Sequence, residues 1–418
     1  MTLSYTEPHL VAEPSETDPL EAIVRRGARQ MLQAVLDHEV KEFLGRCAYE
    51  RAGEATEFRG YRNGYNKERK VTVGSGQIEV SVPRVSDTPP DQESFQSKII
   101  KPYQKRSRTV AELFPKLFVE GLATRDFEPA LRALLGEQAA LSPATVARLN
   151  QKFKAEYEEW RHSSLKEHHF VYIWADGIHL KAGVSTENAA ILVVIGVDAA
   201  GTKHFLALEE GYRESKESWL EVLRSLRARG MNEPALAVAD GALGFWAALP
   251  QVWAQTKAQR CWFHKAGNIL DKLPQRERAE AAKRIRAIYL APSRAEAERL
   301  ARVLIGEWRA VHYQKAADCL SVDLVACLQF FDYPQEHWRH LRTTNPIESV
   351  FASIRLRTDA AKRFRTARSG VHLIFQLLKR CEKTWVRISA PERLREVSLP
   401  CALPAATNNA TQQFETAA

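Results

Sequence analysis

Three carboxylates stand in settings that suit metal-assisted chemistry. Asp176 and Asp240 each end an apolar run, and Glu348 lies far downstream, just after the Asn345-Pro346 pair. An apolar run that ends in an acid is typical of a buried strand with a carboxylate at its tip, and Asn-Pro is typical of a helix start. Three acids gathered at one end of a sheet could bind hard cations such as Mg²⁺ through oxygen. A pair of such ions can hold the attacking and leaving oxygens of a phosphoryl transfer, so the pattern suggests an enzyme that cuts and rejoins nucleic acid.

Each of these acids also has a purely structural interpretation. Asp176 and Asp240 are both followed by glycine, and Asp-Gly between apolar runs is a strong hairpin signal. Glu348 falls at the third helical position if Asn345 is the N-cap, where a Glu can close a capping box. The two roles of Glu348 are compatible, because an apolar stripe on its helix would leave Glu348 and Arg355 together on another face. That stripe consists of Ile347, Val350, Phe351 and Ile354.

The segment after Glu348 is strongly basic. Ten cations lie between residues 355 and 387, and only Asp359 and Glu382 oppose them. A run of charge is usually a solvated face, but one beside a candidate metal site suits contacts to the phosphates of DNA. The residues that we expect to contact DNA are Arg355, Arg357, Lys362, Arg363 and Arg365.

Cys261 and His264 are spaced like half of a zinc site. The remaining cysteines and histidines are scattered and supply no second pair at a ligand spacing. We therefore favour a structural role, in which the cysteine packs beside the active-site sheet and the histidine forms a hydrogen bond there.

Composition is typical of a globular protein with two or three domains. The chain has 418 residues, of which 45% are hydrophobic and 27% charged, and its 60 Lys and Arg outnumber its 51 Asp and Glu. A basic balance is compatible with a polyanionic partner. The cysteines form no CxxC pair, no apolar run approaches the ~18 residues of a membrane span, and the first 18 residues contain acids but no Lys or Arg. We therefore expect a protein of the reducing cytoplasm.

The N-terminal part of the chain is expected to be mainly helical, with one β-hairpin. A helical period covers residues 18–46, and residues 71–82 alternate like two strands around a glycine-containing turn. Residues 83–102 are expected to form a linker. Residues 125–135 and 143–153 could form a helix-turn-helix, although an ordinary helical hairpin is favoured by the spacing alone.

The central part of the chain is expected to fold as β-β-β-α-β. This order indicates an α/β protein with a ribonuclease H-like mixed sheet. Residues 263–342 are largely helical and separate the second acid from the third, so we expect them to be an insertion in the catalytic domain. The expected strands are 170–175, 189–197, 203–208 and 236–239, with a helix at 215–229.

From about residue 20 to 385 the chain resembles the mutator-type transposases of bacterial insertion sequences, a DDE family with a ribonuclease H-like fold. The order of several motifs makes this resemblance specific. They are Gly196–Gly201, Glu217–Trp219, Ala239–Phe245, Gln259–His264 with Asn268, Arg342–Glu348 and Arg355–Thr358.

The resemblance implies a catalytic and metal-binding triad of Asp176, Asp240 and Glu348, which would hold two Mg²⁺ ions with Mn²⁺ as a substitute. The Cys-x-x-His motif of the family falls on Cys261 and His264. The implied activity is strand cleavage and strand transfer at the ends of an insertion sequence. The implied partners are the terminal inverted repeats of its own element, target DNA and at least one further copy of the chain in a synaptic complex. The implied location is the nucleoid of a bacterial cytoplasm, with no membrane partner.

The expected organisation follows from these elements. A loose arm precedes a DNA-binding region, and a helical insertion divides the catalytic domain into two parts. The expected boundaries are 1–17 for the arm, 18–165 for the DNA-binding region, 166–262 and 343–390 for the two catalytic parts, 263–342 for the insertion and 391–418 for a disordered tail.

Two other functions compete with this one. The first is a catalytically inactive DNA-binding protein derived from a transposase, which the presence of all three acids disfavours. The second is a ribonuclease H-type nuclease acting on hybrids or junctions. The large helical insertion and the separate basic N-terminal region favour an enzyme acting on DNA ends instead.

Overall fold

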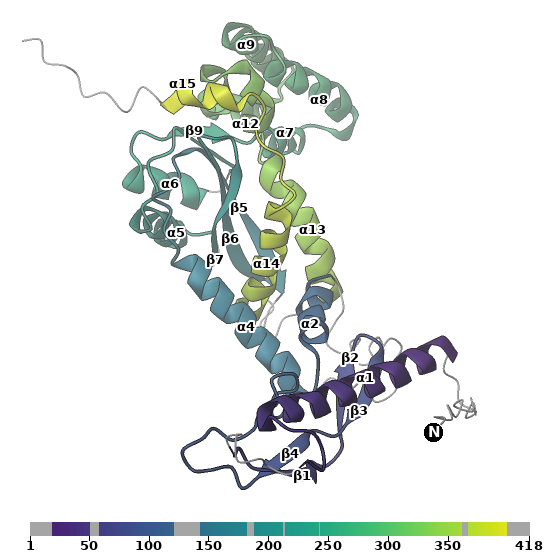
Figure 1. The fold of residues 1–418 in the computed structure, drawn as a ribbon. Coiled ribbons are helices and arrows are strands. Elements are labelled where there is room, and N and C mark those ends of the chain that lie inside the picture. The colour runs from purple at the N-terminus through teal and green to yellow at the C-terminus, as the bar shows by residue number, and fades with distance from the viewer. Residues whose placement is uncertain are drawn as a thin grey trace, which may run out of the picture. The chain divides into compact units, whose positions relative to one another are not determined.

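The most apolar runs of the sequence form a five-stranded mixed sheet (Figure 1). The spatial order is β7-β6-β5-β8-β9, in which β7, β6 and β5 are antiparallel and β5, β8 and β9 are parallel. The expectation of an α/β protein with a mixed sheet is confirmed. The strands are β5 (Phe170–Lys181), β6 (Asn188–Asp198), β7 (Lys203–Gly211), β8 (Leu236–Ala239) and β9 (Lys257–Arg260).

This computed structural model describes most of the chain, which divides into two compact units of residues 1–149 and 150–418. The described residues are 19–50, 58–120, 143–181, 188–211, 214–241, 243–361 and 367–398.

Two features of the sheet differ from the sequence-based expectation. β5 does not end at Asp176 but continues to Lys181, because the apolar strand β6 extends equally far and pairs with it up to Asn188. The strand β9 was missed, because its four residues are polar and too few to show a period. Since β5 continues and β8 is parallel to its neighbour β9, neither Asp-Gly pair forms a hairpin turn, and that interpretation is wrong for both.

Helices cover both faces of the sheet (Figure 1). On one face lie α5 (Lys216–Ala228) and α6 (Leu243–Val252), which share a buried core with β5, β6 and β8. Ser215 is the N-cap of α5 and accepts a hydrogen bond from the backbone N–H of Ser218. On the other face lie α13 (Asn345–Ala361) and α14 (Ala367–Glu382).

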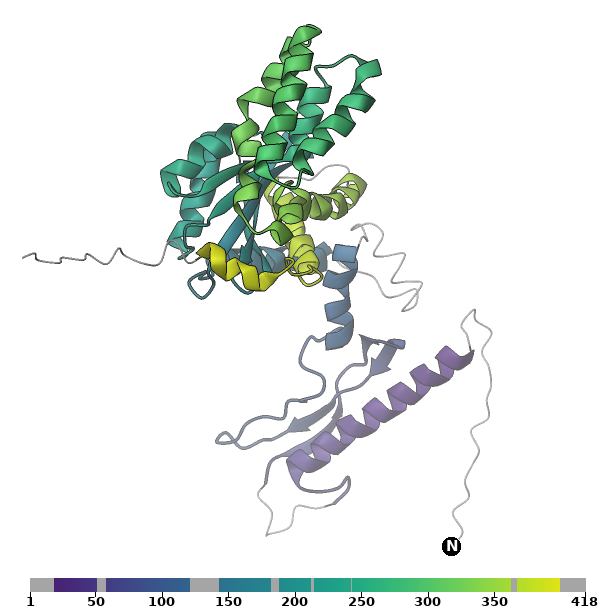
Figure 2. The same ribbon diagram turned by 90° about the horizontal axis from the view of Figure 1, so that it is seen from above.

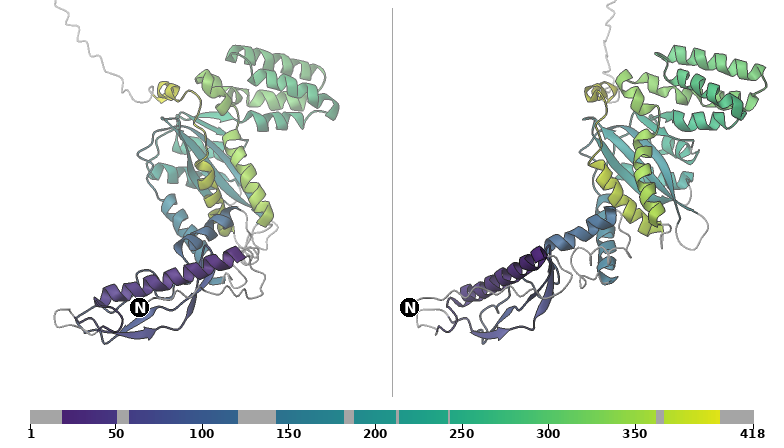
Figure 3. Two further views of the ribbon diagram at one scale, coloured as in Figure 1. Left: turned by 45° about the vertical axis from the view of Figure 1, so that its right-hand side comes forward. Right: turned by 90° about the vertical axis from the view of Figure 1, so that its right-hand side faces the viewer.

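A helical segment, green in Figure 2, connects β9 to α13 and contacts β9 through α11 and η1. Its helices α8, α9 and α10 pack side by side (Figure 3). Alanine, leucine and isoleucine side chains of these helices are buried. The elements are α7 (Trp262–Leu270), α8 (Gln275–Tyr289), α9 (Arg294–Ala310), α10 (Gln314–Val322), α11 (Leu324–Cys327), η1 (Gln329–Asp332), η2 (Gln335–His337) and α12 (Trp338–Leu341).

Residues 391–398 are helical, where the sequence suggested a disordered tail. Two short helices, η3 (Pro391–Arg393) and α15 (Leu394–Ser398), follow α14. Leu394 is fully buried, and the backbone N–H of Ile388 donates to the carbonyl of Gly201 in the β6–β7 turn. These contacts make the expectation wrong for residues 391–398, and residues 399–418 lie outside the described part of the chain.

In the first unit, α1 (Pro19–Leu44) packs on the hairpin of β2 (Arg69–Val73) and β3 (Gly76–Val80), which confirms the predicted helix and hairpin. The start of the expected linker is instead a strand, β4 (Pro83–Ser86), which pairs with β1 (Tyr61–Tyr65). The sequence did not predict β4 because it begins with a proline, and it did not predict β1 because its tyrosine- and glycine-containing residues show no strand pattern. The unit also contains α2 (Arg108–Glu120), and α4 (Pro143–Arg161) begins in it.

Several expectations fall outside the described residues. They concern the N-terminal arm (1–17) and the first helix of the possible helix-turn-helix (125–135), whereas its second helix lies within α4. Among the residues that the structure describes, no helix is long and apolar enough to span a bilayer.

Candidate active site

The first two acids lie at the same level of two neighbouring parallel strands. Asp176 is within β5 and pairs with Val193 of β6. On the other side of β5, the strand β8 ends at Ala239, which pairs with Ala175, and Asp240 is the next residue. Asp176 is therefore the first residue of β5 beyond its pairing with β8, and Asp240 is the first residue beyond β8.

Burial and a neighbouring charge make Asp176 a weak acid. Burial raises the pKa of Asp176 to about 7, and the charge of Asp240 adds to the rise, against the effect of a 2.8 Å hydrogen bond from the backbone N–H of Gly177. A divalent cation beside both carboxylates would offset the cost of burial and of like charge. The oxygen donors of this pair therefore fit a hard ion such as Mg²⁺.

Glu348 lies in the first turn of α13, which docks through the predicted apolar stripe. The stripe residues are buried, while Glu348 is half-buried and Arg355 is exposed, as expected. The backbone N–H groups of Ile347 and Glu348 both donate to the carbonyl of Thr344, so Thr344 rather than Asn345 is the N-cap of α13. The Thr344 hydroxyl donates to Glu348 Oε1 at 2.5 Å, which fixes the carboxylate.

Cys261 and His264 lie beside Glu348. Cys261 precedes α7 and is fully buried. Its Sγ accepts a 3.3 Å hydrogen bond from the backbone N–H of Thr344 and lies 3.3 Å from the Thr344 hydroxyl oxygen. The ligand atoms of Cys261, His264 and Glu348 all lie within 4.8 Å of one another, with His264 Nδ1 3.8 Å from Glu348 Oε1. The sequence did not predict that Glu348 would lie beside Cys261 and His264.

His264 interacts with two of the three acids, Glu348 and Asp176. The side chain of Cys261 raises the pKa of His264 to about 9, burial opposes this, and Glu348 and Asp176 add to the rise. In turn, the charge of His264 acts to lower the pKa of Asp176. Its buried Nδ1 has no hydrogen-bond partner among the described residues. An imidazolium at this position places one positive charge among the carboxylates.

Hydrogen bonds join the two ends of the helical segment next to the acids. The backbone N–H of Cys261 donates to the carbonyl of Ala239 at 2.8 Å, and that of Trp262 donates to the carbonyl of Arg342 at 2.9 Å. With the Thr344–Cys261 contacts, these bonds fix the residues before Glu348 beside the end of β8. These bonds therefore hold Glu348 near the end of β8, although a long segment separates β9 from α13 in the sequence.

Glu214 is a fourth acid at the site, and it was not predicted from the sequence. Its carboxylate covers Gly177, where an added Cβ would lie 2.2 Å from Glu214 Oε1. Burial raises the pKa of Glu214, and the charge of Asp240 adds to the rise. His179 Nε2 lies 3.4 Å from Glu214 Oε1. Glu214 lies in a polar loop that carries no motif. The one sequence feature that could have indicated it is the glycine after Asp176, because a larger residue at position 177 would clash with the Glu214 carboxylate.

The cations expected to contact DNA are only partly described. Arg355 is exposed on α13, and Arg357 belongs to the same helix although its side chain is not described. Lys362, Arg363 and Arg365 lie outside the described residues. The position of these three remains a prediction from sequence.

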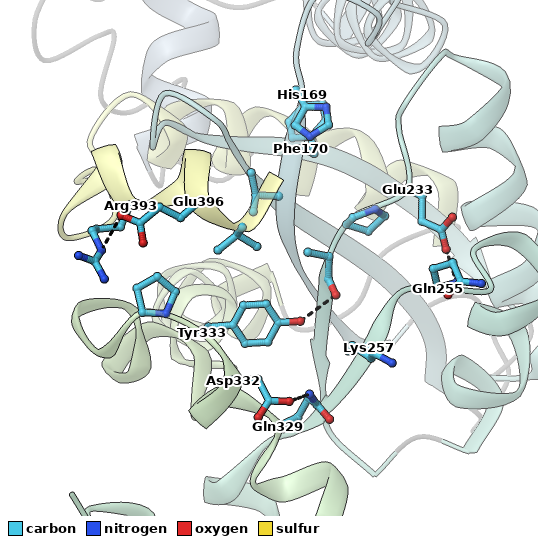
Figure 4. A pocket seen from close by; sticks show the side chains of 15 residues that line it. His169, Phe170, Glu233, Gln255, Lys257, Gln329, Asp332, Tyr333, Arg393 and Glu396 are labelled. Carbon is cyan, nitrogen blue, oxygen red and sulfur yellow. Dashed lines mark hydrogen bonds and ion pairs between the residues drawn. The ribbon is translucent and has the colours of Figure 1, made fainter. Parts of the chain in front are cut away.

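A cavity of about 600 Å³ lies away from the acids, at the opposite ends of the parallel strands (Figure 4). It is lined by residues at the starts of β5 and β8, by η1 and by α15. Tyr333 crosses it and donates a 2.9 Å hydrogen bond to the carbonyl of Ala235. None of the three acids lines this cavity.

Comparison with known proteins identifies relatives along most of the chain. The family model described as "Transposase, Mutator family" matches residues 5–388. The chain is 42% identical over 282 residues to the transposase for insertion sequence element IS6120 of Mycolicibacterium smegmatis, which covers 68% of this chain and 87% of the relative. It is 40% identical to the transposase for IST2 of Acidithiobacillus ferrooxidans over 65% of this chain and 92% of the relative.

A third relative covers more of the chain at lower identity. The transposase for insertion sequence element IS406 of Burkholderia multivorans is 30% identical over 385 residues, which is 89% of this chain and 96% of the relative.

The raised pKa of Asp176 leads to a prediction about stability. The carboxyl has a pKa of about 7 in the folded protein against an ordinary value of 3.8, so between these values the folded state holds a proton that the unfolded state has lost. The metal-free protein therefore loses stability as the pH rises across this window. Asp176→Asn should raise Tm, and the gain should grow from about pH 4 to about pH 7 and then stay level, as measured by calorimetry in the presence of a chelator.

Asp271→Asn is the matched control, because the side chain of Asp271 is 76% exposed. It should leave the pH dependence of Tm unchanged. A gain for Asp176→Asn that is the same at every pH would contradict the assignment.

Proposed function

The chain belongs to the mutator family of insertion-sequence transposases, and we propose that it cleaves and joins DNA at the ends of an insertion sequence through Asp176, Asp240 and Glu348. The observation that carries this proposal is the pair of half-buried carboxylates at the same level of β5 and β8, with Glu348 linked to Asp176 through His264. Buried acids of like charge cost stability, which a metal-dependent reaction would account for.

The strand order supports a ribonuclease H-like catalytic domain. Three antiparallel strands followed by a helix and the parallel strand β8 match the order expected from the sequence, and β9 adds a second parallel strand that the sequence did not predict. We infer the catalytic domain to consist of residues 166–262 and 343–390, with 263–342 as the insertion. Residues 391–398 then extend its second part.

Asp176, Asp240 and Glu348 would hold two Mg²⁺ ions, with Mn²⁺ as a substitute. When bound, such ions supply a deprotonated oxygen nucleophile and stabilise the leaving 3′-oxygen. The residues of the chain supply the positioning: the Thr344 hydroxyl fixes Glu348, and the Gly177 N–H orients Asp176. The positive charge of His264 balances part of the negative charge that the acids bring together.

DNA would be held by the basic end of the second catalytic part. Arg355 lies on the same helix as Glu348 and is exposed, so it suits contact with a phosphate next to the reacting one. We propose that Arg357, Lys362, Arg363 and Arg365 continue this contact. Recognition of the terminal inverted repeats is assigned to residues 18–165, and pairing of two ends to a dimer or larger assembly.

Substitution of the acids tests the proposal. Asp176→Asn, Asp240→Asn and Glu348→Gln should each reduce cleavage of DNA that carries the element's ends by several orders of magnitude in Mg²⁺, while binding measured by gel shift stays within a few-fold of wild type. Asp271→Asn is the control and should cleave normally. Binding by the wild type without cleavage in Mg²⁺ or Mn²⁺ would instead favour a DNA-binding protein that has lost catalysis.

Glu214→Gln tests the fourth acid. The charge of Glu214 contributes to the raised pKa of Asp176, so its removal should lower that pKa. We expect the acid limb of the pH profile of cleavage to move to lower pH at limiting Mg²⁺, because Asp176 then ionises earlier. Glu217→Gln, an exposed acid in the first turn of α5, should leave the profile unchanged. An unshifted profile for Glu214→Gln would remove Glu214 from the site.

A further inference from the structure

A second group of metal-ligand side chains lies at the other end of β5. His168 precedes β5, Asp198 ends β6 and His204 is the second residue of β7. One ligand atom from each lies within 4.8 Å of the other two. We propose that His168, Asp198 and His204 bind a transition-metal ion, with Zn²⁺ as the expected occupant, at a structural site separate from the catalytic acids.

The distances suit a tetrahedral ion. Zinc bonds of about 2.0–2.1 Å place neighbouring tetrahedral ligand atoms roughly 3.3 Å apart. Asp198 Oδ2 lies 2.8 Å from His204 Nε2 and 3.6 Å from His168 Nδ1, so the two separations bracket that value. Shifts of well under 1 Å in each side chain would complete three sides of a tetrahedron.

Asp198 is held so that one of its oxygens faces both imidazoles. The residue is buried, and its Oδ1 accepts hydrogen bonds from the backbone N–H groups of Ala200 and Thr202. Oδ2 is left for His168 and His204. A hydrogen bond between Asp198 and His204 accounts for the position of the His204 ring. It does not account for the position of the His168 ring, which faces the same oxygen.

The two histidines differ in their exposure to solvent. The ring of Phe170 packs edge-on against His204, and the ring centroids of His168 and His204 are 4.5 Å apart. The side chain of His168 is 42% exposed, so an ion could enter from solvent and a water could complete the coordination. Two imidazoles and one carboxylate favour a transition metal over Mg²⁺, which prefers oxygen ligands.

The position in the sheet indicates a structural role. Asp198 pairs with Phe170, whereas Asp176 is six residues farther along β5, roughly 20 Å away at the rise of a strand. The ion would tie the entry to β5 to the β6–β7 turn. That turn also contacts the C-terminal segment, since Gly201 accepts from the N–H of Ile388 and lies against Pro391.

Zinc titration of the full-length, metal-free protein tests the proposal. We expect Zn²⁺ to bind the wild type and raise its Tm, and His168→Ala and His204→Ala each to weaken the binding of one equivalent by at least tenfold. His312→Asn is the control, because His312 is exposed and its backbone φ of 65° is one that Asn accepts. It should bind Zn²⁺ like the wild type.

Two further measurements distinguish this site from a metal bound at Cys261 and His264 and from a loss of folding. His168 is exposed, so His168→Ala should keep the metal-free Tm even if His204→Ala does not. Co²⁺ bound at this site should give no thiolate charge-transfer band, whereas an ion on Cys261 and His264 should give one. Unchanged stoichiometry and affinity in both histidine variants would overturn the proposal, as would a single bound Co²⁺ whose thiolate band is lost in Cys261→Ser.

Discussion

The site depends on two carboxylates of like charge held at one level of adjacent parallel strands. Asp176 and Asp240 are brought together by backbone pairing, since Ala175 and Ala239 are partners in the β5–β8 ladder. The ladder fixes their spacing whether or not the side chains attract each other. Burial and repulsion then raise the pKa of Asp176 to about 7, a cost that apolar packing on both faces of the sheet must offset.

The third acid reaches this pair through the ends of the helical segment. Cys261 is the junction, because its N–H bonds the carbonyl of Ala239 and its Sγ accepts from Thr344. Thr344 in turn fixes Glu348. The intervening helices add their own buried core and also contact the junction, since Trp262 Nε1 and Gln259 Nε2 donate to the carbonyl of Cys327. The Cys-x-x-His motif thus connects β8, α7 and α13 beside the acids.

The sequence predicted the elements with strong patterns and missed those without them. The apolar runs located β5, β6, β7 and β8, and the stripe from Ile347 to Ile354 correctly oriented α13. The polar strand β9 and the strands β1 and β4 carry no such pattern. The continuation of β5 past Asp176 depends on pairing with β6, which is a tertiary property. The position of Glu214 beside Gly177 and the contact between His264 and Glu348 likewise depend on packing between segments that are distant in the sequence. The spacing of residues within a segment does not predict such packing.

The most direct measurement is the location of bound Mn²⁺ in crystals of the full-length protein, from anomalous diffraction. We predict a peak within about 2.0–2.6 Å of carboxylate oxygens of both Asp176 and Asp240. We also expect this peak to disappear in Asp240→Asn, while the sheet keeps its register. A fully ordered sheet with Mn²⁺ bound only elsewhere, and none beside Asp176 and Asp240 at saturating concentration, would contradict the central claim.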